Sequence, residues 1–156
     1  MKYIKLFESF EEEDIDIDDI KDIFLTISDY GLGVDEAFIA HLASMGGKDM
    51  IDDHNQLDMT NTKRGIIIKL LTKRLAHENS KFEFSEEFFE ELEFSIEHFE
   101  SKYGCKLSNI YLSKTKSFWV SDLDNLKKYS KDITPAALTW LSGIQIAFVL
   151  NDSVDN

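Results

Sequence analysis

The chain has 156 residues and a formal net charge of −13, with 43% hydrophobic and 12% aromatic residues. That length fits one domain of ordinary size with its own core. The aromatic content, including 12 phenylalanines, excludes the disordered class despite the charge. The negative charge also argues against binding to a phosphate backbone, whose affinity depends on basic side chains. We therefore expect a folded protein that does not bind nucleic acid directly.

The composition also bears on location. Cys105 is the only cysteine, so an internal disulfide is impossible and a reducing cytoplasm is favoured. The longest apolar stretches, 66–68 with 70–71 and 146–150, fall far short of the roughly 20 residues that a membrane-spanning helix needs. The first ten residues lack the uninterrupted apolar region of a secretory signal. We therefore expect no membrane contact.

The first half of the chain predicts one helix, two strands and a long connection. Apolar residues at positions 20, 23, 24 and 27 share one helical face, which predicts a helix over 14–30. A strand follows over 34–43, although Asp35 and Glu36 disturb its alternation. Residues 44–64 contain a Gly-Gly pair and several aspartates, which predicts a long loop or one edge element. The nearly continuous apolar run of 65–73 predicts a central strand.

The second half begins with an amphipathic pattern. Apolar residues recur every three or four positions from 89 to 103, which predicts a helix over 85–103 that starts at Ser85 and ends at Gly104. The remaining patterns predict paired strands at 106–113 and 116–120, a short helix at 122–129, a helical turn at 134–140 and a last strand at 144–150. This order predicts an α+β fold of the α-β-β-α-β-β type, with two main helices on one face of a mainly antiparallel sheet. Residues 11–156 form the single predicted domain, with its long loop near 44–64.

No motif establishes a reaction. The best local cluster for a divalent metal is Asp52, Asp53 and His54, because carboxylate and imidazole together suit several transition ions. A solvated polar loop has the same composition, and no second histidine lies at ligand spacing. The aspartates of 14–19 fail as a calcium loop, which needs glycine at its sixth position and glutamate at its twelfth, and helix capping explains them. The chain has no nucleophile elbow or phosphate-binding glycine loop. We expect no cofactor and favour a non-enzymatic protein.

Two sets of residues are candidates for protein contact. Of the 30 acidic residues, eight lie in 8–19 and eight in 83–100. Ordinary solvation of amphipathic helices explains such acids, but an acidic contact surface is the alternative, and it would comprise Asp16, Asp19, Glu90, Glu91, Glu97 and Glu100. A group of aromatic residues either fills the core or forms a contact patch on the open face of the sheet. This group consists of Tyr111, Phe118, Trp119 and Trp140.

The N-terminal sequence MKYIKLFES resembles the targeting peptides of proteins packaged in the heads of large contractile-tailed bacteriophages. Those peptides begin with Met-Lys, contain an aromatic residue and end at a site for the prohead maturation protease. That protease cleaves after glutamate in the pattern Leu or Ile, any residue, Glu, with a small residue next. Here Leu6, Phe7 and Glu8 are followed by Ser9. The resemblance covers about ten residues and implies that segment 1–10 targets the protein and is cut after Glu8. Alternatively, its apolar residues form a terminal element that caps the core.

The sequence favours two functions, and a third, a metal-dependent enzyme that uses Asp52, Asp53 and His54, would need further ligands to converge from elsewhere in the chain. The first is a non-enzymatic phage protein, packaged in or attached to the virion, that acts by contact with a capsid or scaffold protein. The alternative is an acidic inhibitor in the host cytoplasm that binds a basic site on a host defence or DNA-processing protein. A continuous acidic stripe spaced like duplex phosphates favours the inhibitor. Scattered charges favour the virion protein.

Overall fold

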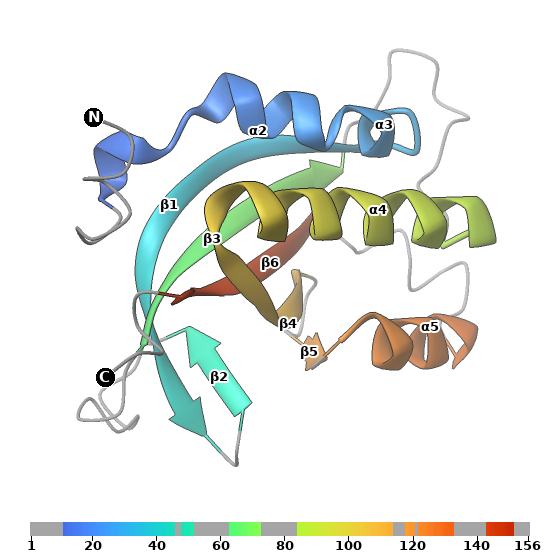
Figure 1. Cartoon of the computed structure of the whole chain (residues 1–156). Coiled ribbons are helices and arrows are strands. Elements are labelled where there is room, and N and C mark those ends of the chain that lie inside the picture. The colour runs from blue at the N-terminus through green and yellow to red at the C-terminus, as the bar shows by residue number, and fades with distance from the viewer. Residues whose placement is uncertain are drawn as a thin grey trace.

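A computed structural model describes residues 11–45, 48–51, 63–72, 84–113, 118–120, 122–132 and 143–151. Helices lie against a strongly bent sheet (Figure 1), and the predicted α+β class is confirmed. In chain order the elements are η1 (Glu12–Asp14), α2 (Ile17–Ile23), α3 (Leu25–Ser28), β1 (Leu32–Met45), β2 (Lys48–Ile51), β3 (Lys63–Thr72), α4 (Glu86–Tyr103), β4 (Cys105–Ser113), β5 (Phe118–Val120), α5 (Leu123–Asp132) and β6 (Gly143–Leu150).

The sheet has the strand order β2-β1-β3-β6-β4-β5, and each of its pairings is antiparallel. The continuous apolar run of β3 does lie in the centre, between β1 and β6. The last strand, β6, inserts between β3 and β4, an arrangement that the sequence did not indicate. β2 also contacts β4 although three strands separate them in the order, so the sheet curls across its width.

Two predicted elements differ from the structure in instructive ways. The single helix expected over 14–30 is divided into η1, α2 and α3, and α2 ends at Phe24, whose backbone (φ −101°, ψ 19°) leaves the helical range while its ring stays buried. The strand over 34–43 is longer than expected, and its register shifts between Val34 and Glu36. That bulge is the physical reason for the disturbed alternation at Asp35.

The predicted connections are described only in part. Residues 48–51 of the expected long loop form the edge strand β2, while residues 52–62 lie outside the described residues. The expected turn at 134–140, including Trp140, also lies outside them. Phe118 and Trp119 pair through their backbones with β4, and the ring of Tyr111 is half-buried. The predicted aromatic patch therefore stays a prediction.

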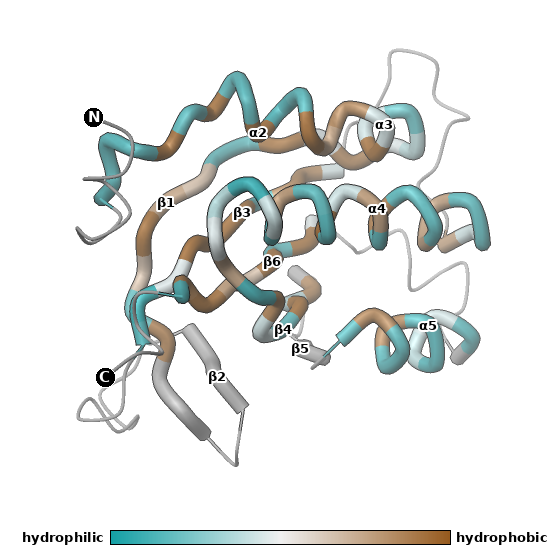
Figure 2. Tube along the Cα trace, viewed as in Figure 1, coloured by the Kyte–Doolittle hydropathy of each residue, from teal (hydrophilic) through white to brown (hydrophobic). Residues whose placement is uncertain are grey.

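The main core lies between the sheet and the helices. Apolar residues of α2, α3, α4 and α5 form one buried cluster with alternate residues of β3, β4 and β6, and Figure 2 shows hydrophobic positions of α4 alternating with hydrophilic ones. Phe99 of α4 is central to this cluster, because its ring centroid lies 4.5 Å from that of Phe148, 4.6 Å from that of Tyr103 and 6.1 Å from that of Phe24. Each such buried side chain contributes about 1.5–3 kcal/mol of transfer free energy. The core thus fixes α4 with one face inward.

A smaller apolar cluster occupies the other face of the sheet. Leu42, Ile67, Ala147 and Val149 are buried there, with Phe38 partly buried beside them. None of the helices in the described part of the chain is long and apolar enough to cross a membrane.

Candidate protein-contact surface on helix α4

Helix α4 has defined ends. The Ser85 hydroxyl accepts a hydrogen bond from the Phe88 amide at 3.1 Å, which satisfies one of the free amides of the first turn. Gly104 ends the helix in the left-handed region, with φ at 62°. Glu86 and Glu87 lie in the first turn, where the helix dipole favours negative charge. These two glutamates therefore have a structural explanation, and the other acids of α4 do not share it.

The outward side of α4 carries an exposed aromatic ring among acids. Phe94 is 67% exposed. Residues three and four positions away are its neighbours on a helix surface, so Glu90 and Glu91 lie one turn before it and Glu97 and His98 one turn after. We call these five residues the α4 outer face. Among the residues that the structure describes, it combines the most exposed large apolar side chain with a concentration of charge.

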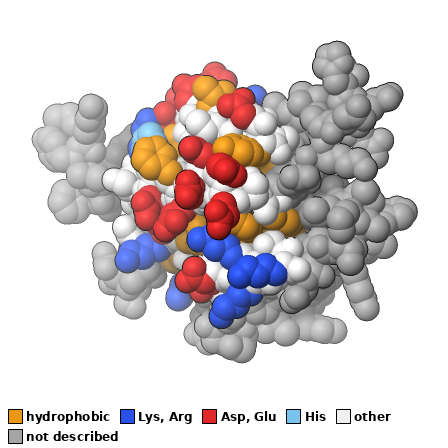
Figure 3. Space-filling model, turned by 90° about the vertical axis from the view of Figure 1, so that its right-hand side faces the viewer, with side chains coloured by type: hydrophobic (Ala, Val, Ile, Leu, Met, Phe, Trp, Pro, Cys, Tyr) orange, Lys and Arg blue, Asp and Glu red, His pale blue; other side chains and the backbone are white. Residues whose placement is uncertain are grey.

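The acids of the α4 outer face create a negative field that reaches a neighbouring element. The pKa of Tyr30, which follows α3, is raised first by desolvation and then by the charges of Glu91, Glu87, Asp29 and Glu90. Within the described residues, no salt bridge joins Glu90, Glu91 or Glu97 to a cation. In Figure 3 acidic side chains gather with apolar ones on this side of the molecule, and basic side chains lie below them.

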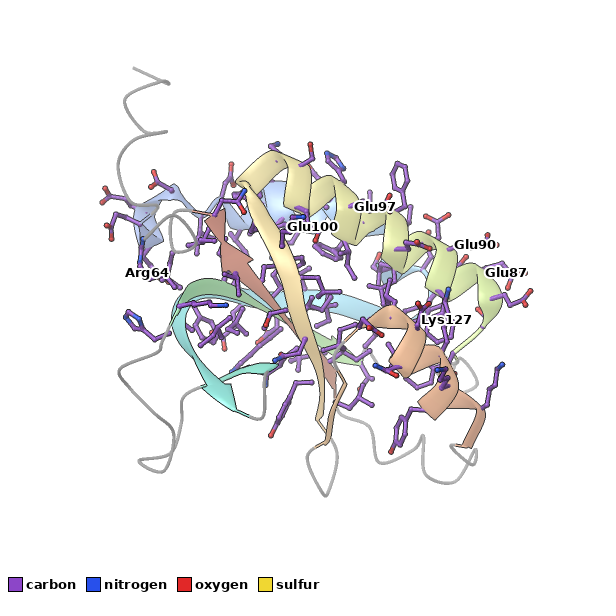
Figure 4. The ribbon with its side chains drawn as sticks, turned by 60° about the horizontal axis from the view of Figure 1, so that its bottom comes forward. Arg64, Glu87, Glu90, Glu97, Glu100 and Lys127 are labelled. Carbon is purple, nitrogen blue, oxygen red and sulfur yellow. The ribbon has the colours of Figure 1, made fainter. Side chains whose placement is uncertain are left out.

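Helix α5 forms the basic border of this surface. It carries Lys127, Lys128 and Lys131, and α5 contacts α4. The Lys127 ammonium lies 5.9 Å from the centroid of the Phe89 ring, within cation–π range. Figure 4 shows Lys127 below the row that Glu87, Glu90 and Glu97 make along α4. The negative surface is therefore bounded by lysines on this side.

Three of the six acids predicted for the contact surface are engaged within the fold. Asp16 caps α2, because its carboxylate accepts hydrogen bonds from the amides of Asp18 and Asp19 at 3.1 and 3.2 Å. Glu100 accepts a hydrogen bond at 2.8 Å from the Leu107 amide on the outer edge of β4. The structure thus gives Asp16 and Glu100 a role in holding helix ends and strand edges.

Asp19 is the third engaged acid, and it joins α2 to α4. Its carboxylate accepts hydrogen bonds from the Lys102 ammonium and, at 2.8 Å, from the Tyr103 hydroxyl. The bond to Lys102 is the main cause that lowers the pKa of Asp19, which burial opposes and Tyr103 reinforces. Burial and the same carboxylate raise the pKa of Tyr103. The other three acids of the predicted set, Glu90, Glu91 and Glu97, form no salt bridge within the described residues.

The predicted processing site and the predicted metal cluster fall on residues that the structure does not describe. Leu6, Phe7, Glu8 and Ser9 of the predicted processing site, and Asp52, Asp53 and His54 of the metal candidate, lie outside the described residues. Among the residues that are described, no group of three His, Cys, Asp or Glu side chains could hold a metal ion. Cys105 is 2% exposed, and burial raises the pKa of its thiol, which makes it unreactive.

Sequence reasoning missed Phe94, although a signal was present. The apolar stripe of α4 runs through 89, 92, 96, 99 and 103, and position 94 falls on the opposite side of the helix. An aromatic residue there breaks the pattern, which indicates a contact role instead of a core role.

No family model, curated protein or solved structure matches this chain.

Proposed function

We propose that this protein acts by protein–protein contact, and that the α4 outer face binds a partner with a basic surface. The observation that carries the proposal is the exposure of Phe94, 67%, between two turns that bear Glu90, Glu91 and Glu97. An aromatic anchor within a polar rim is the usual anatomy of a binding site between proteins. The partner would supply an apolar depression for the ring and lysine or arginine around it.

The acids contribute to recognition more than to stability. The pairs Glu86–Glu90, Glu87–Glu91 and Glu93–Glu97 each place like charges four residues apart, which destabilises a helix by about 0.2–0.5 kcal/mol per pair. The free protein would be more stable with neutral residues at Glu90, Glu91, Glu93 and Glu97, which lie beyond the first turn. Charges at the rim of an interface instead raise the association rate and select oppositely charged partners. A basic partner would relieve the repulsion on binding.

The arrangement of the acids favours contact with a structural protein over imitation of nucleic acid. A duplex-like stripe would have to continue from α4 to the aspartates of α2. Lys102 stands at that junction and pairs with Asp19, and Asp16 is used as a helix cap. Of the six predicted acids, those that remain available thus all lie on α4, so the inhibitor is the less favoured of the two functions.

The setting that we propose for this contact is a phage virion, with a capsid or scaffold protein as the partner. It rests on the resemblance of residues 1–9 to a packaging peptide. Mass spectrometry of the protein recovered from purified virions tests this setting. A chain that begins at Ser9 supports packaging and processing, and absence of the protein from the particles would favour a host partner instead.

The contact itself is tested with a defined probe. A fluorescently labelled, helix-forming peptide with leucines on one face and lysines on the other supplies the proposed chemistry. Because truncation of a central aromatic anchor costs 2 kcal/mol or more, we expect Phe94→Ser to weaken binding by at least tenfold. Leu25→Ser is the matched control, since Leu25 is 61% exposed on α3 and lies outside the α4 outer face. Equal effects of the two substitutions would contradict the proposal.

A further inference from the structure

The outer edge of β1 is a second surface with unused bonding capacity, separate from the α4 outer face. Strand β3 pairs with β1 from Leu32 to Leu42, whereas β2, on the other side, pairs only with Leu42–Met45. Within the described part of the chain, the outer edge from Leu32 to His41 therefore has no partner strand. Unpaired strand edges are templates for the addition of another chain.

One hydrogen bond shows which groups this edge presents. The Ile39 amide donates a hydrogen bond at 2.8 Å to the Glu12 carboxylate, so it points away from β3. Because alternate residues of a strand direct their amides to the same side, Ala37 and His41 face the same edge. The carboxylate of Glu12 occupies the place that the carbonyl of an added strand would take. The edge can thus accept an extended chain along residues 37–41.

The two edges of the sheet are closed to different degrees. The outer edge of β4 pairs with β5 from Ile110 to Leu112, and its Leu107 amide is bonded to Glu100 on the long helix α4 in a partly buried position. At β1 the corresponding carboxylate, Glu12, is exposed and belongs to η1, a helix of three residues. The hydrogen bond that covers the Ile39 amide is therefore easier to displace than the one at Leu107.

The charges around this edge select the occupant. Glu11, Glu12, Glu13, Asp35 and Glu36 are all exposed there. Within the described residues, Glu36 pairs with Lys69 at 2.9 Å and Glu11 lies 3.8 Å from Arg64, and neither Glu12, Glu13 nor Asp35 has such a pair. A second copy of this chain would bring two such acidic edges together, which opposes pairing between copies. An extended segment that carries lysine or arginine has the complementary charge.

We propose that residues 37–41 of β1 bind a basic, extended segment of a partner protein by strand addition. Main-chain hydrogen bonds to Ala37, Ile39 and His41 hold the segment, which displaces Glu12 from the Ile39 amide. Its apolar side chains lie beside Phe38 and Ala40, which are half-buried, and its basic side chains face the surrounding acids. This surface would serve in addition to the α4 outer face.

The test uses the full chain and two synthetic peptides of ten alternating lysine and valine residues. The second peptide has the same sequence but carries N-methyl groups on alternate backbone amides, so charge is kept and strand pairing is blocked. We expect the first peptide to bind at least tenfold more tightly than the second. Equal affinities would overturn the proposal, because attraction of charge alone would then explain the binding.

Two further measurements locate the site. On addition of the first peptide, we expect hydrogen exchange to slow at the amides of Ala37 and His41, and unchanged exchange there would overturn the proposal. We also expect Ala37→Pro to weaken binding at least tenfold, since Ala37 donates no bond to β3, while Leu25→Ser, at an exposed position of α3, leaves this affinity unchanged. A dimer of the protein alone that Ala37→Pro abolishes would overturn the assignment to a basic partner, because a second copy would then be the occupant.

Discussion

Asp19 provides a quantitative test of the division between structural and exposed acids. Substitution Asp19→Ala removes the hydrogen bond from Tyr103, which as a partly buried bond to a charged group is worth about 1.5–3 kcal/mol. It also removes the ion pair with Lys102, whose side chain is 49% exposed, for about 0.2–1 kcal/mol. Because alanine has a higher helix propensity than aspartate, the substitution also returns about 0.5 kcal/mol of stability to α2. The net loss in the free energy of unfolding should be about 2 kcal/mol, measured by urea denaturation at pH 7.

The pH dependence of this loss follows from the lowered pKa of Asp19. The unfolded chain binds a proton at the ordinary value of 3.8, whereas the folded protein binds it only at lower pH. The contribution of Asp19 is therefore complete above about pH 5 and disappears as the pH falls through the lowered pKa. The difference in the free energy of unfolding between wild type and Asp19→Ala should therefore be smaller at pH 2.5 than at pH 7 in parallel urea titrations.

Asp22→Ala, an exposed position of the same helix, is the control and should change stability by less than about 0.5 kcal/mol. A loss equal to that of the control, or a gap that does not change with pH, would refute this reasoning.

Three further predictions concern packing. Gly65→Ala should destabilise the protein by about 3 kcal/mol in urea titrations, because a Cβ atom there would lie 2.3 Å from the Phe148 carbonyl oxygen; a loss below 1 kcal/mol would show that the central strands can separate. Gly104→Ala should lower the free energy of unfolding by only about 1–2 kcal/mol, since the φ of 62° is strained for alanine but the atom nearest to the added Cβ is 3.8 Å away. A loss larger than that of Gly65→Ala would contradict this prediction. Phe99→Ala should lower the free energy of unfolding by about 3–5 kcal/mol, because its ring is buried. Phe94→Ala, at an exposed position, should stay within about 0.5 kcal/mol of wild type when both variants are compared by thermal unfolding. Similar losses for the two variants would contradict the assigned exposures.

The sequence predicted those elements whose signals are local. The period of the apolar residues, Ser85 and Gly104 together define α4, because a cap, a stripe and a stop residue all act within a few turns. The continuous apolar run placed β3 in the centre for an equally local reason, burial on both faces. The division at Phe24 and the bulge beside Asp35 were missed, because tertiary packing decides whether a helix or strand continues through a position.

The contact surface was only partly predictable. Asp19 and its partner Lys102 are 83 residues apart, so no local pattern reveals that this acid is neutralised within the fold. The bond from Leu107 to Glu100 requires the chain to reverse at Gly104 and bring β4 back along α4. Phe94, by contrast, could have been found, since its position on the polar side of the helix is a property of the sequence alone.

The most direct test of the α4 outer face compares two double variants that change the net charge equally. Glu90→Gln with Glu97→Gln alters the surface around Phe94, and Asp18→Asn with Asp22→Asn removes the same charge from exposed positions of α2. Binding of the leucine–lysine helix peptide is measured by fluorescence anisotropy at low salt. We predict that the α4 variant binds at least fivefold more weakly, keeps or slightly gains stability, and that the α2 variant stays within twofold of wild type. Equal weakening of both variants would contradict the account, because net charge would then attract the peptide without a defined surface.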